Sequence, residues 1–193
     1  IVRPFYSHRT ACAVAHEARF RWLAWADFLG APDPRGLARY TEAGGLILLR
    51  DSEPDAFAGS LAALRAVGVP FEVVDADAVA RLCPGIDLTG YGPPRRRDDP
   101  LFGEPSGGRI VGGIHLPAAG YVNDPQLAAH NLMTSARSAG AEFRFGAAVV
   151  EVLRSDGGID GVALADGSRI SCPRVVNAAG PHSARLNALA GCD

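Results

Sequence analysis

The sequence predicts an α/β fold, and three observations support this prediction. Apolar residues recur at steps of three and four over residues 10–30, which is typical of an amphipathic helix. Short apolar runs without that period, at Leu46–Leu49 and Phe71–Val74, predict buried strands. Near the C-terminus, a short apolar strand at Arg174–Asn177 runs into small residues and then a helix, the kind of junction at which α/β sheets bind ligands.

The remaining elements follow from caps, turns and periodicity. Asp77 is placed to cap a short helix, and Asp124 with Pro125 makes a good helix start, because the carboxylate accepts orphan amide hydrogens and proline needs none there. The apolar face Ala128, Leu132 and Ala136 is expected to pack on a sheet. Helices are predicted over residues 54–67, 77–82, 125–140 and 183–190, strands over 109–116, 142–145, 147–153, 159–164 and 168–172, and tight turns at 155–158 and 166–167.

Composition excludes several classes of protein. The net charge is −2, and the basic cluster at residues 95–97 is followed by two aspartates, so no basic stripe for nucleic acid is present. No apolar run approaches the roughly 18 residues that span a bilayer, and we expect a cytoplasmic protein. The four cysteines lack metal-ligand spacing and are expected to be buried, so no metal site is predicted. The absence of lysine excludes Schiff-base chemistry from this segment.

Residues 93–108 are rich in proline, glycine and charge, which predicts a surface loop at the seam between two halves. The chain opens on Ile1 and enters an apolar stretch at once. We therefore expect an internal piece of a longer protein, with a processed mature terminus as the alternative.

The pattern most informative about function is Val-Val-Asn-Ala-Ala-Gly-Pro at residues 175–181. A strand that ends in residues without bulky side chains lets a phosphate-bearing ligand approach the backbone closely. We expect Ala178, Ala179 and Gly180 to form the end of a parallel strand that faces this ligand. By itself the pattern has an equally good explanation in helix–strand packing.

Other motifs accompany this pattern in a fixed order: Ser-Ala-Gly-Ala at 138–141, Val149, a hairpin turn at Asp156-Gly157, and Asp-Gly-Ser at 166–168. The arrangement resembles the D-amino-acid oxidase and sarcosine oxidase superfamily of flavoproteins, which includes glycine oxidase-like enzymes. The resemblance is dense over residues 110–191 and looser before them. The family usually has tryptophan after Gly-Pro, where this chain has His182, and we assign that histidine no role.

The resemblance implies FAD as cofactor, with Val149, Ala178, Ala179 and Gly180 lining its adenine side and dinucleotide. Val150 stands beside Val149 and is the alternative at that position. It also implies that Arg3 holds a substrate carboxylate, a task that suits the planar fork of guanidinium donors. A surface or interdomain salt bridge is the other interpretation of Arg3. No catalytic base is predicted.

The resemblance further implies an incomplete Rossmann-like FAD-binding domain, residues 1–30 and 116–193, interleaved with part of an α+β substrate domain, residues 31–115. The expected reaction is oxidation of a C–N bond in an amine or amino acid of the sarcosine, glycine or D-amino-acid type. Alternatives are a flavin dehydrogenase of a 2-hydroxy acid or glycerol phosphate, and an inactive flavoprotein remnant. The family fingerprint Gly-x-Gly-x-x-Gly, which cradles the FAD pyrophosphate, does not occur in the sequence, so the chain alone is expected to be inactive.

Overall fold

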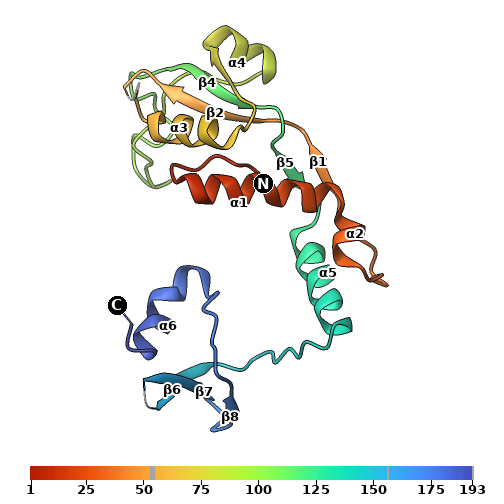
Figure 1. Ribbon diagram of the computed structural model, residues 1–193. Coiled ribbons are helices and arrows are strands. Elements are labelled where there is room, and N and C mark those ends of the chain that lie inside the picture. Colours follow the sequence, from red (N-terminus) through yellow and green to blue (C-terminus); the bar gives the residue numbers. More distant parts are fainter. Residues whose placement is uncertain (53–54, 156, 193) are drawn as a thin grey trace. The chain divides into compact units, whose positions relative to one another are not determined.

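The computed structural model describes residues 1–52, 55–155 and 157–192, and the chain divides into two compact units, Ile1–Gly140 and Ala141–Asp193 (Figure 1). The first unit contains α1 (Arg9–Leu23), α2 (Trp25–Leu29), β1 (Tyr40–Glu42), β2 (Gly45–Arg50), α3 (Ala58–Val67), β3 (Glu72–Asp75), α4 (Ala76–Leu82), β4 (Ile110–Leu116), β5 (Gly120–Val122) and α5 (Pro125–Ser138). The second contains β6 (Val149–Ser155), β7 (Gly158–Leu164), β8 (Arg169–Ser171), the 3-10 helix η1 (Gly180–His182) and α6 (Ser183–Leu189).

The first unit is organised around an antiparallel sheet in the order β2-β4-β3. The strands predicted around residues 46–49, 71–74 and 109–116 are all present. Ile114 and Leu116 of β4 are buried in one apolar cluster with Leu64 of α3 and with Phe5 and Cys12 from the start of the chain. The predicted helix at 54–67 begins at Ala58, and its expected first residue, Pro54, lies outside the described residues.

A second, two-stranded ribbon of β1 and β5 was not predicted, because three-residue strands carry too little alternation to be recognised. The start of the chain adds to it: Val2 and Gly120 exchange two backbone hydrogen bonds, of 2.8 and 2.9 Å. Gly120 is required here, because a Cβ atom at this position would lie 2.0 Å from the carbonyl oxygen of Thr41.

The single helix predicted for residues 10–30 is wrong, because the chain bends at Ala24 into α1 and α2. The bend stacks the Trp22 and Trp25 rings with centroids 4.3 Å apart. Trp25 is buried, as expected for a core residue, whereas Val14 of the same apolar stripe is 64% exposed. Only the second half of the apolar stripe therefore contacts the core.

Helix α5 begins as predicted, with the Asp124 carboxylate accepting hydrogen bonds from the amides of Gln126 and Leu127. The predicted packing of its Ala128–Leu132–Ala136 face on a sheet is wrong. Ala128 instead packs with Trp25, Leu29 and Ala38, and Leu132 is 44% exposed. The buried face is set by a polar residue, Asn131, which a purely apolar pattern misses.

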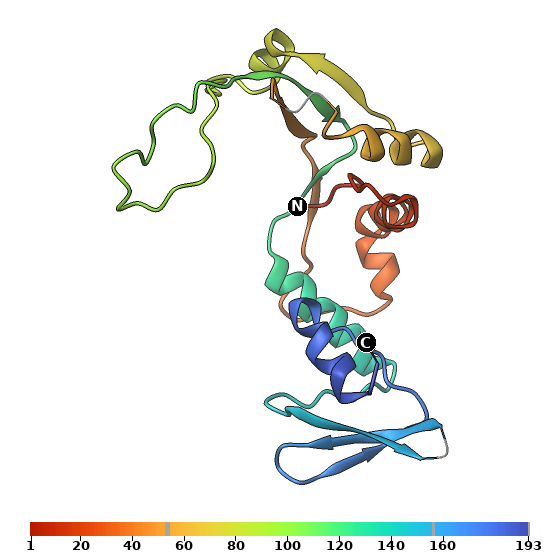
Figure 2. The same ribbon diagram turned by 90° about the vertical axis from the view of Figure 1, so that its left-hand side faces the viewer.

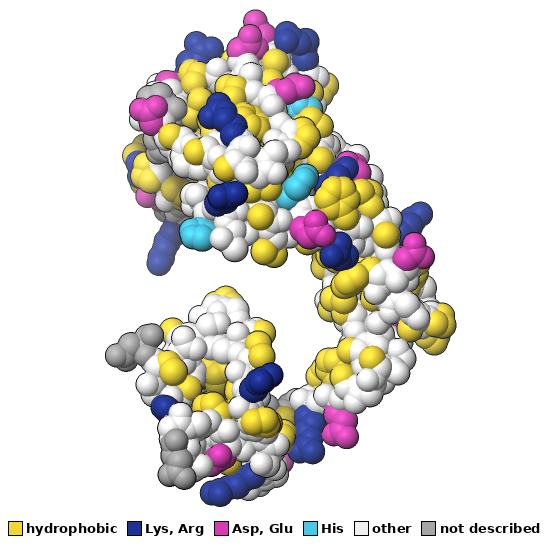
Figure 3. All heavy atoms as spheres, in the orientation of Figure 1, with side chains coloured by type: hydrophobic (Ala, Val, Ile, Leu, Met, Phe, Trp, Pro, Cys, Tyr) yellow, Lys and Arg dark blue, Asp and Glu magenta, His cyan; other side chains and the backbone are white. Residues whose placement is uncertain are grey.

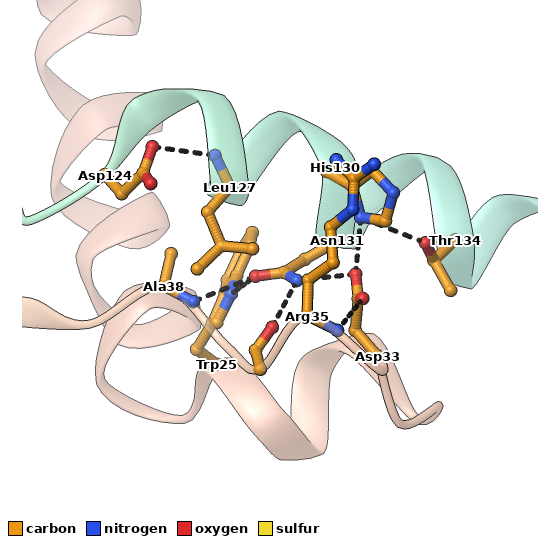
Figure 4. Close-up of polar contacts among 10 residues, drawn as sticks. Trp25, Asp33, Arg35, Ala38, Asp124, Leu127, His130, Asn131 and Thr134 are labelled. Atoms are coloured by element: carbon orange, nitrogen blue, oxygen red, sulfur yellow. Dashed lines mark hydrogen bonds and ion pairs between the residues drawn. The ribbon is translucent and has the colours of Figure 1, made fainter.

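Asn131 is 1% exposed and forms four hydrogen bonds (Figure 4). Its amide oxygen accepts from the Trp25 indole and the Ala38 amide, at 3.3 and 2.9 Å. Its nitrogen donates to the carbonyl of Gly36 and to the carboxylate of Asp33. All the hydrogen-bonding capacity of the amide is thus used in a buried setting, which ties α5 to the segment after α2.

The Asp33 carboxylate completes this network. Its oxygens accept from the Arg35 amide at 2.9 Å and from Asn131 at 2.8 Å, and Nδ1 of His130 lies 2.7 Å away. These hydrogen bonds, first that from the Arg35 backbone, hold the pKa of Asp33 well below its usual range against the opposing effect of desolvation.

The connection between α4 and β4 is the irregular loop that the sequence predicts, and Figure 2 shows it projecting from the sheet. The basic cluster lies there, exposed, with Arg95 paired to Asp99 at 3.3 Å. Helix α4 is capped by Asp75 and not by Asp77, so its N-cap lies two residues earlier than expected. The prediction that the cysteines are buried holds for Cys12, whereas the two at positions 83 and 192 are exposed.

The second unit is an antiparallel sheet in the order β6-β7-β8, followed by η1 and α6. The predicted strands over 147–153, 159–164 and 168–172, the turn at 166–167 and the helix at 183–190 are present. Asp156 of the other predicted turn lies outside the described residues. The strand expected at 142–145 is wrong: Phe143 and Phe145 stack on each other instead, 6.3 Å between centroids.

Figure 3 shows arginine and acidic side chains interspersed on the visible face of the protein. Among the described residues, no helix combines the length and apolar character needed to cross a membrane.

Replacing Asp124 with alanine should lower the free energy of unfolding by about 0.5–2 kcal/mol, because two amides at the start of α5 lose their acceptor. The change is measured by urea denaturation. Asp124→Asn is the control and should retain most of the stability, since its amide oxygen can still accept. Equal losses in both variants would contradict a capping role.

The Asp33 network predicts a specific response to acid. The pKa of Asp33 in the folded protein lies below the unfolded value, about 3.9. Its stabilisation is therefore complete above that value and is lost as the pH falls towards the folded pKa. Asp33→Asn should unfold at lower urea concentration at pH 7 and lose less additional stability between pH 5 and pH 3 than the parent. Asp77→Asn, a change at an exposed carboxylate of α4, should leave the acid response unaltered.

Candidate functional site

The predicted cofactor residues all lie in the second unit. Val149 begins β6 and pairs with Leu164 of β7, after which Glu151 pairs with Ala163. Val150 is thus an extra residue on β6, a β-bulge, and its side chain is 50% exposed. A bulge interrupts the ladder locally and leaves backbone groups free to bind something else. Both Val149 and its alternative, Val150, stand at this interruption.

The segment that carries the small-residue motif is extended without being part of a sheet. Arg174–Asn177 was predicted as a strand, with Ala178–Gly180 at the end of a parallel ladder, and this prediction is wrong for the described residues, whose sheets are all antiparallel. A parallel strand needs neighbours on which to pair, and β6, β7 and β8 pair only with one another. Val176, an apolar residue, is 87% exposed as a result.

Ala178, Ala179 and Gly180 are exposed, and their backbone is not covered by larger side chains. Gly180 opens η1 with φ of +55°, a left-handed conformation that strains residues with a β-branched side chain. A Cβ atom there would meet nothing within 4 Å. Glycine is therefore favoured at this position by its backbone conformation, and not by crowding from neighbouring atoms.

Asn177 holds this loop in shape. Its Nδ2 donates to the carbonyl of Ser183 at 2.9 Å and to Oδ1 of Asn187 at 2.7 Å, and its Oδ1 accepts from the amide of Ala179 at 3.1 Å. The side chain thus joins the extended segment, the turn and α6. It stands inside the motif, yet no role was predicted for it. An asparagine between apolar and small residues is the signal that could have revealed it, because such side chains often bond to backbone two residues on.

Helix α6 is joined in turn to the sheet. Arg154 of β6 donates from Nη1 to the carbonyl of Ala190, 2.7 Å away, at the C-terminal end of α6. A cation is favourable at this end of a helix, where carbonyl groups lack partners. Through Asn177 and Arg154, the sheet, α6 and the loop 178–180 form one connected arrangement.

The predicted substrate residue, Arg3, lies in the first unit and is exposed. Its Nη1 donates to the carbonyl of Phe5 at 2.8 Å, and its guanidinium carbon lies 5.8 Å from the centroid of the Tyr6 ring. Among the described residues Arg3 forms no ion pair. The side chain is positioned by neutral groups and keeps donors available for an anion.

The loop suits a dinucleotide in two respects. Small exposed side chains at 178–180 allow close approach to backbone, and the bulge at Val149–Val150 offers unpaired backbone to a flat heterocycle. His182 is exposed at the end of η1; its backbone amide donates to the carbonyl of Ala179 at 3.1 Å, whereas its side chain forms none of the Asn177 hydrogen bonds. Fold and loop thus define a mixed α/β protein with an exposed loop of small residues.

Comparison with known proteins identifies the family within this class. The family model described as FAD dependent oxidoreductase matches residues 1–193, so the chain belongs to that family, whose cofactor is FAD. The fold is similar to that of L-proline dehydrogenase from P. horikoshii, with a TM-score of 0.70 and 20% identity over 99% of this chain. Glycine oxidase from Geobacillus kaustophilus has a TM-score of 0.62 and 24% identity over 97% of this chain. NikD, an amino acid oxidase of nikkomycin biosynthesis, has a TM-score of 0.55 and 21% identity over 96% of this chain.

The chain spans less than half of these proteins: 44% of the proline dehydrogenase, 44% of the glycine oxidase and 41% of NikD. The predicted membership of the amino-acid oxidase superfamily, the incomplete FAD-binding fold and the cofactor are therefore confirmed.

Asn177→Ala should weaken FAD binding by the full-length protein roughly tenfold, because the side chain that joins the Ala179 amide to α6 loses its three hydrogen bonds, one to that amide and two to Ser183 and Asn187. Asn187→Ala removes one of the three and should have a smaller effect. The measurement is a fluorescence titration of apoprotein with FAD. Wild-type affinity in Asn177→Ala would show that the loop keeps its shape without this side chain.

Proposed function

We propose that this chain is a segment of an enzyme that oxidises a C–N bond of an amine or amino acid with FAD. The observation that carries the proposal is the family match along the whole chain. The choice of substrate is supported by the three similar structures, whose names describe enzymes of proline, glycine and another amino acid.

In this proposal the backbone at Val149 contacts the adenine of FAD, with Val150 as the alternative, and Ala178, Ala179 and Gly180 lie against the dinucleotide. Bound FAD supplies the hydride acceptor, so the protein has to orient the substrate and shield it from water. Residues 1–30 and 116–193 belong to the FAD domain, and residues 31–115 belong to the substrate domain.

Arg3 holds the carboxylate of the substrate. Its free donors and its fixed position beside Phe5 and Tyr6 support this role, because a guanidinium already oriented loses less freedom when it binds. A carboxylate also distinguishes amino acids from simple amines. Both a 2-hydroxy acid and an amino acid satisfy Arg3, so the nature of the oxidised bond has to be tested directly.

The test is an assay of the full-length, FAD-loaded protein. Glycine, sarcosine, proline and D-amino acids are compared with lactate and glycerol 3-phosphate, and flavin bleaching is followed without oxygen. We expect bleaching by at least one amino acid. Bleaching by lactate or glycerol phosphate alone would establish the alternative dehydrogenase, and no bleaching by any compound would favour an inactive remnant.

A second measurement tests Arg3. Arg3→Gln should raise KM for the amino acid about 10- to 100-fold, as expected for loss of a charged hydrogen bond. Arg96→Gln, in the exposed loop after α4, is the control and should leave KM unchanged. Equal KM values for the two variants would remove Arg3 from the substrate site.

A further inference from the structure

A cavity of about 280 Å³ in the first unit is bounded by Arg3 and by residues of β2 and β5. Its lining includes only two side chains that can donate hydrogen bonds, those of Arg3 and Tyr121. The remainder is glycine or aliphatic: Ile1, Gly44, Gly45, Leu46, Ile47, Leu116, Ala119 and Gly120. Cavities for drug-sized ligands occupy about 300–1,000 Å³, so this one suits a small molecule.

The backbone places Arg3 and Tyr121 on the same side of an isolated antiparallel β-bridge. Val2 and Gly120 form a hydrogen-bonded antiparallel pair, with bonds of 2.8 and 2.9 Å. Successive side chains of a strand alternate between faces, so Arg3 and Tyr121, each one residue further along, share the face opposite Val2. Diagonal neighbours of this kind are about 7–8 Å apart, a distance that long side chains bridge through a shared ligand.

The two polar side chains are free to bind a ligand. Tyr121 is 46% exposed, and its hydroxyl has no hydrogen-bond partner among the described residues. The next residue, Val122, packs with the Trp25 cluster, so alternation directs Tyr121 away from that core. Nη1 of Arg3 donates a hydrogen bond to the Phe5 carbonyl, and the other guanidinium nitrogens have no acceptor among the described residues.

We infer that Tyr121 is a second carboxylate-binding residue, which donates its phenolic hydrogen to the oxygen of the substrate carboxylate that Arg3 leaves free. The aliphatic remainder of the cavity accepts a small, apolar side chain, so the site selects short aliphatic amino acids over acidic or basic ones. This inference rests on the proposed function, because it assigns a second residue to the carboxylate that Arg3 binds there.

The Val2–Gly120 pair is what makes the arrangement possible. Gly120 lies so close to β1 that any side chain would collide with the Thr41 carbonyl. Because the Val2–Gly120 pair holds the start of the chain against β5, it also fixes how far Arg3 lies from Tyr121.

The test uses the full-length protein with FAD bound and propionate as an unreactive probe, compared with propionamide. Tyr121→Phe should weaken propionate roughly tenfold in isothermal titration, as expected for a hydrogen bond to a charged group. Propionamide, which lacks the charge, should lose much less affinity. Tyr91→Phe removes a phenolic hydroxyl that is hydrogen-bonded to Asp87, outside this cavity, and should leave propionate binding unchanged.

The outcomes separate this inference from the proposed function. Unchanged propionate affinity in Tyr121→Phe would overturn the role of Tyr121, whatever the enzyme oxidises. If the protein oxidises no amino acid and Tyr121→Phe still loses propionate selectively, the proposed reaction fails while the carboxylate site stands. A loss of equal size for propionate and propionamide would show a general packing effect and would also overturn the inference.

Discussion

The hydrogen bonds of Asn131 are the constraint on which the first unit depends. One buried amide fixes Trp25, the carbonyl of Gly36, the amide of Ala38 and the carboxylate of Asp33 relative to α5. The chain after α2 then enters β1 in a defined position, and β1 pairs with β5, the strand that leads into α5. A buried amide with all its bonds formed specifies one arrangement, since any shift would leave several groups without partners.

The β1–β5 ribbon also joins the start of the chain, including Arg3, to the rest of the first unit. Val2 pairs with Gly120, the first residue of β5, so the placement of Arg3 follows from the placement of β5. The position of Arg3, the proposed substrate residue, is therefore set by backbone pairing and close packing at Gly120, and not by contacts of the arginine alone. In the second unit Asn177 has a comparable role on a smaller scale, because its amide connects the loop 178–180 to α6.

The sequence predicted most elements of both units, because caps, turns and apolar runs are local signals. Asp124 with Pro125 marked the start of α5, and Asp166-Gly167 marked the β7–β8 turn. The failures share a physical cause. The bend at Ala24, the polar face of α5 and the unpaired segment 174–177 depend on partners far away in sequence, and an apolar period carries no information about them. The three-residue strands β1 and β5 likewise exist through pairing alone.

In the proposed site, too, only features encoded locally in the sequence could be predicted. Gly180 and its small neighbours could be proposed as a cofactor loop from the sequence alone, because these residues follow one another in a single short stretch of chain. The substrate side is assembled from residues more than a hundred positions apart, and Tyr121 has no local feature that distinguishes it from any exposed tyrosine. A flavin motif reports what all members of the family bind, whereas substrate choice depends on which side chains the fold brings beside Arg3. For that reason the free hydroxyl of Tyr121 and the free guanidinium nitrogens of Arg3, whose side chains line one aliphatic cavity, are the more informative guide to the proposed substrate.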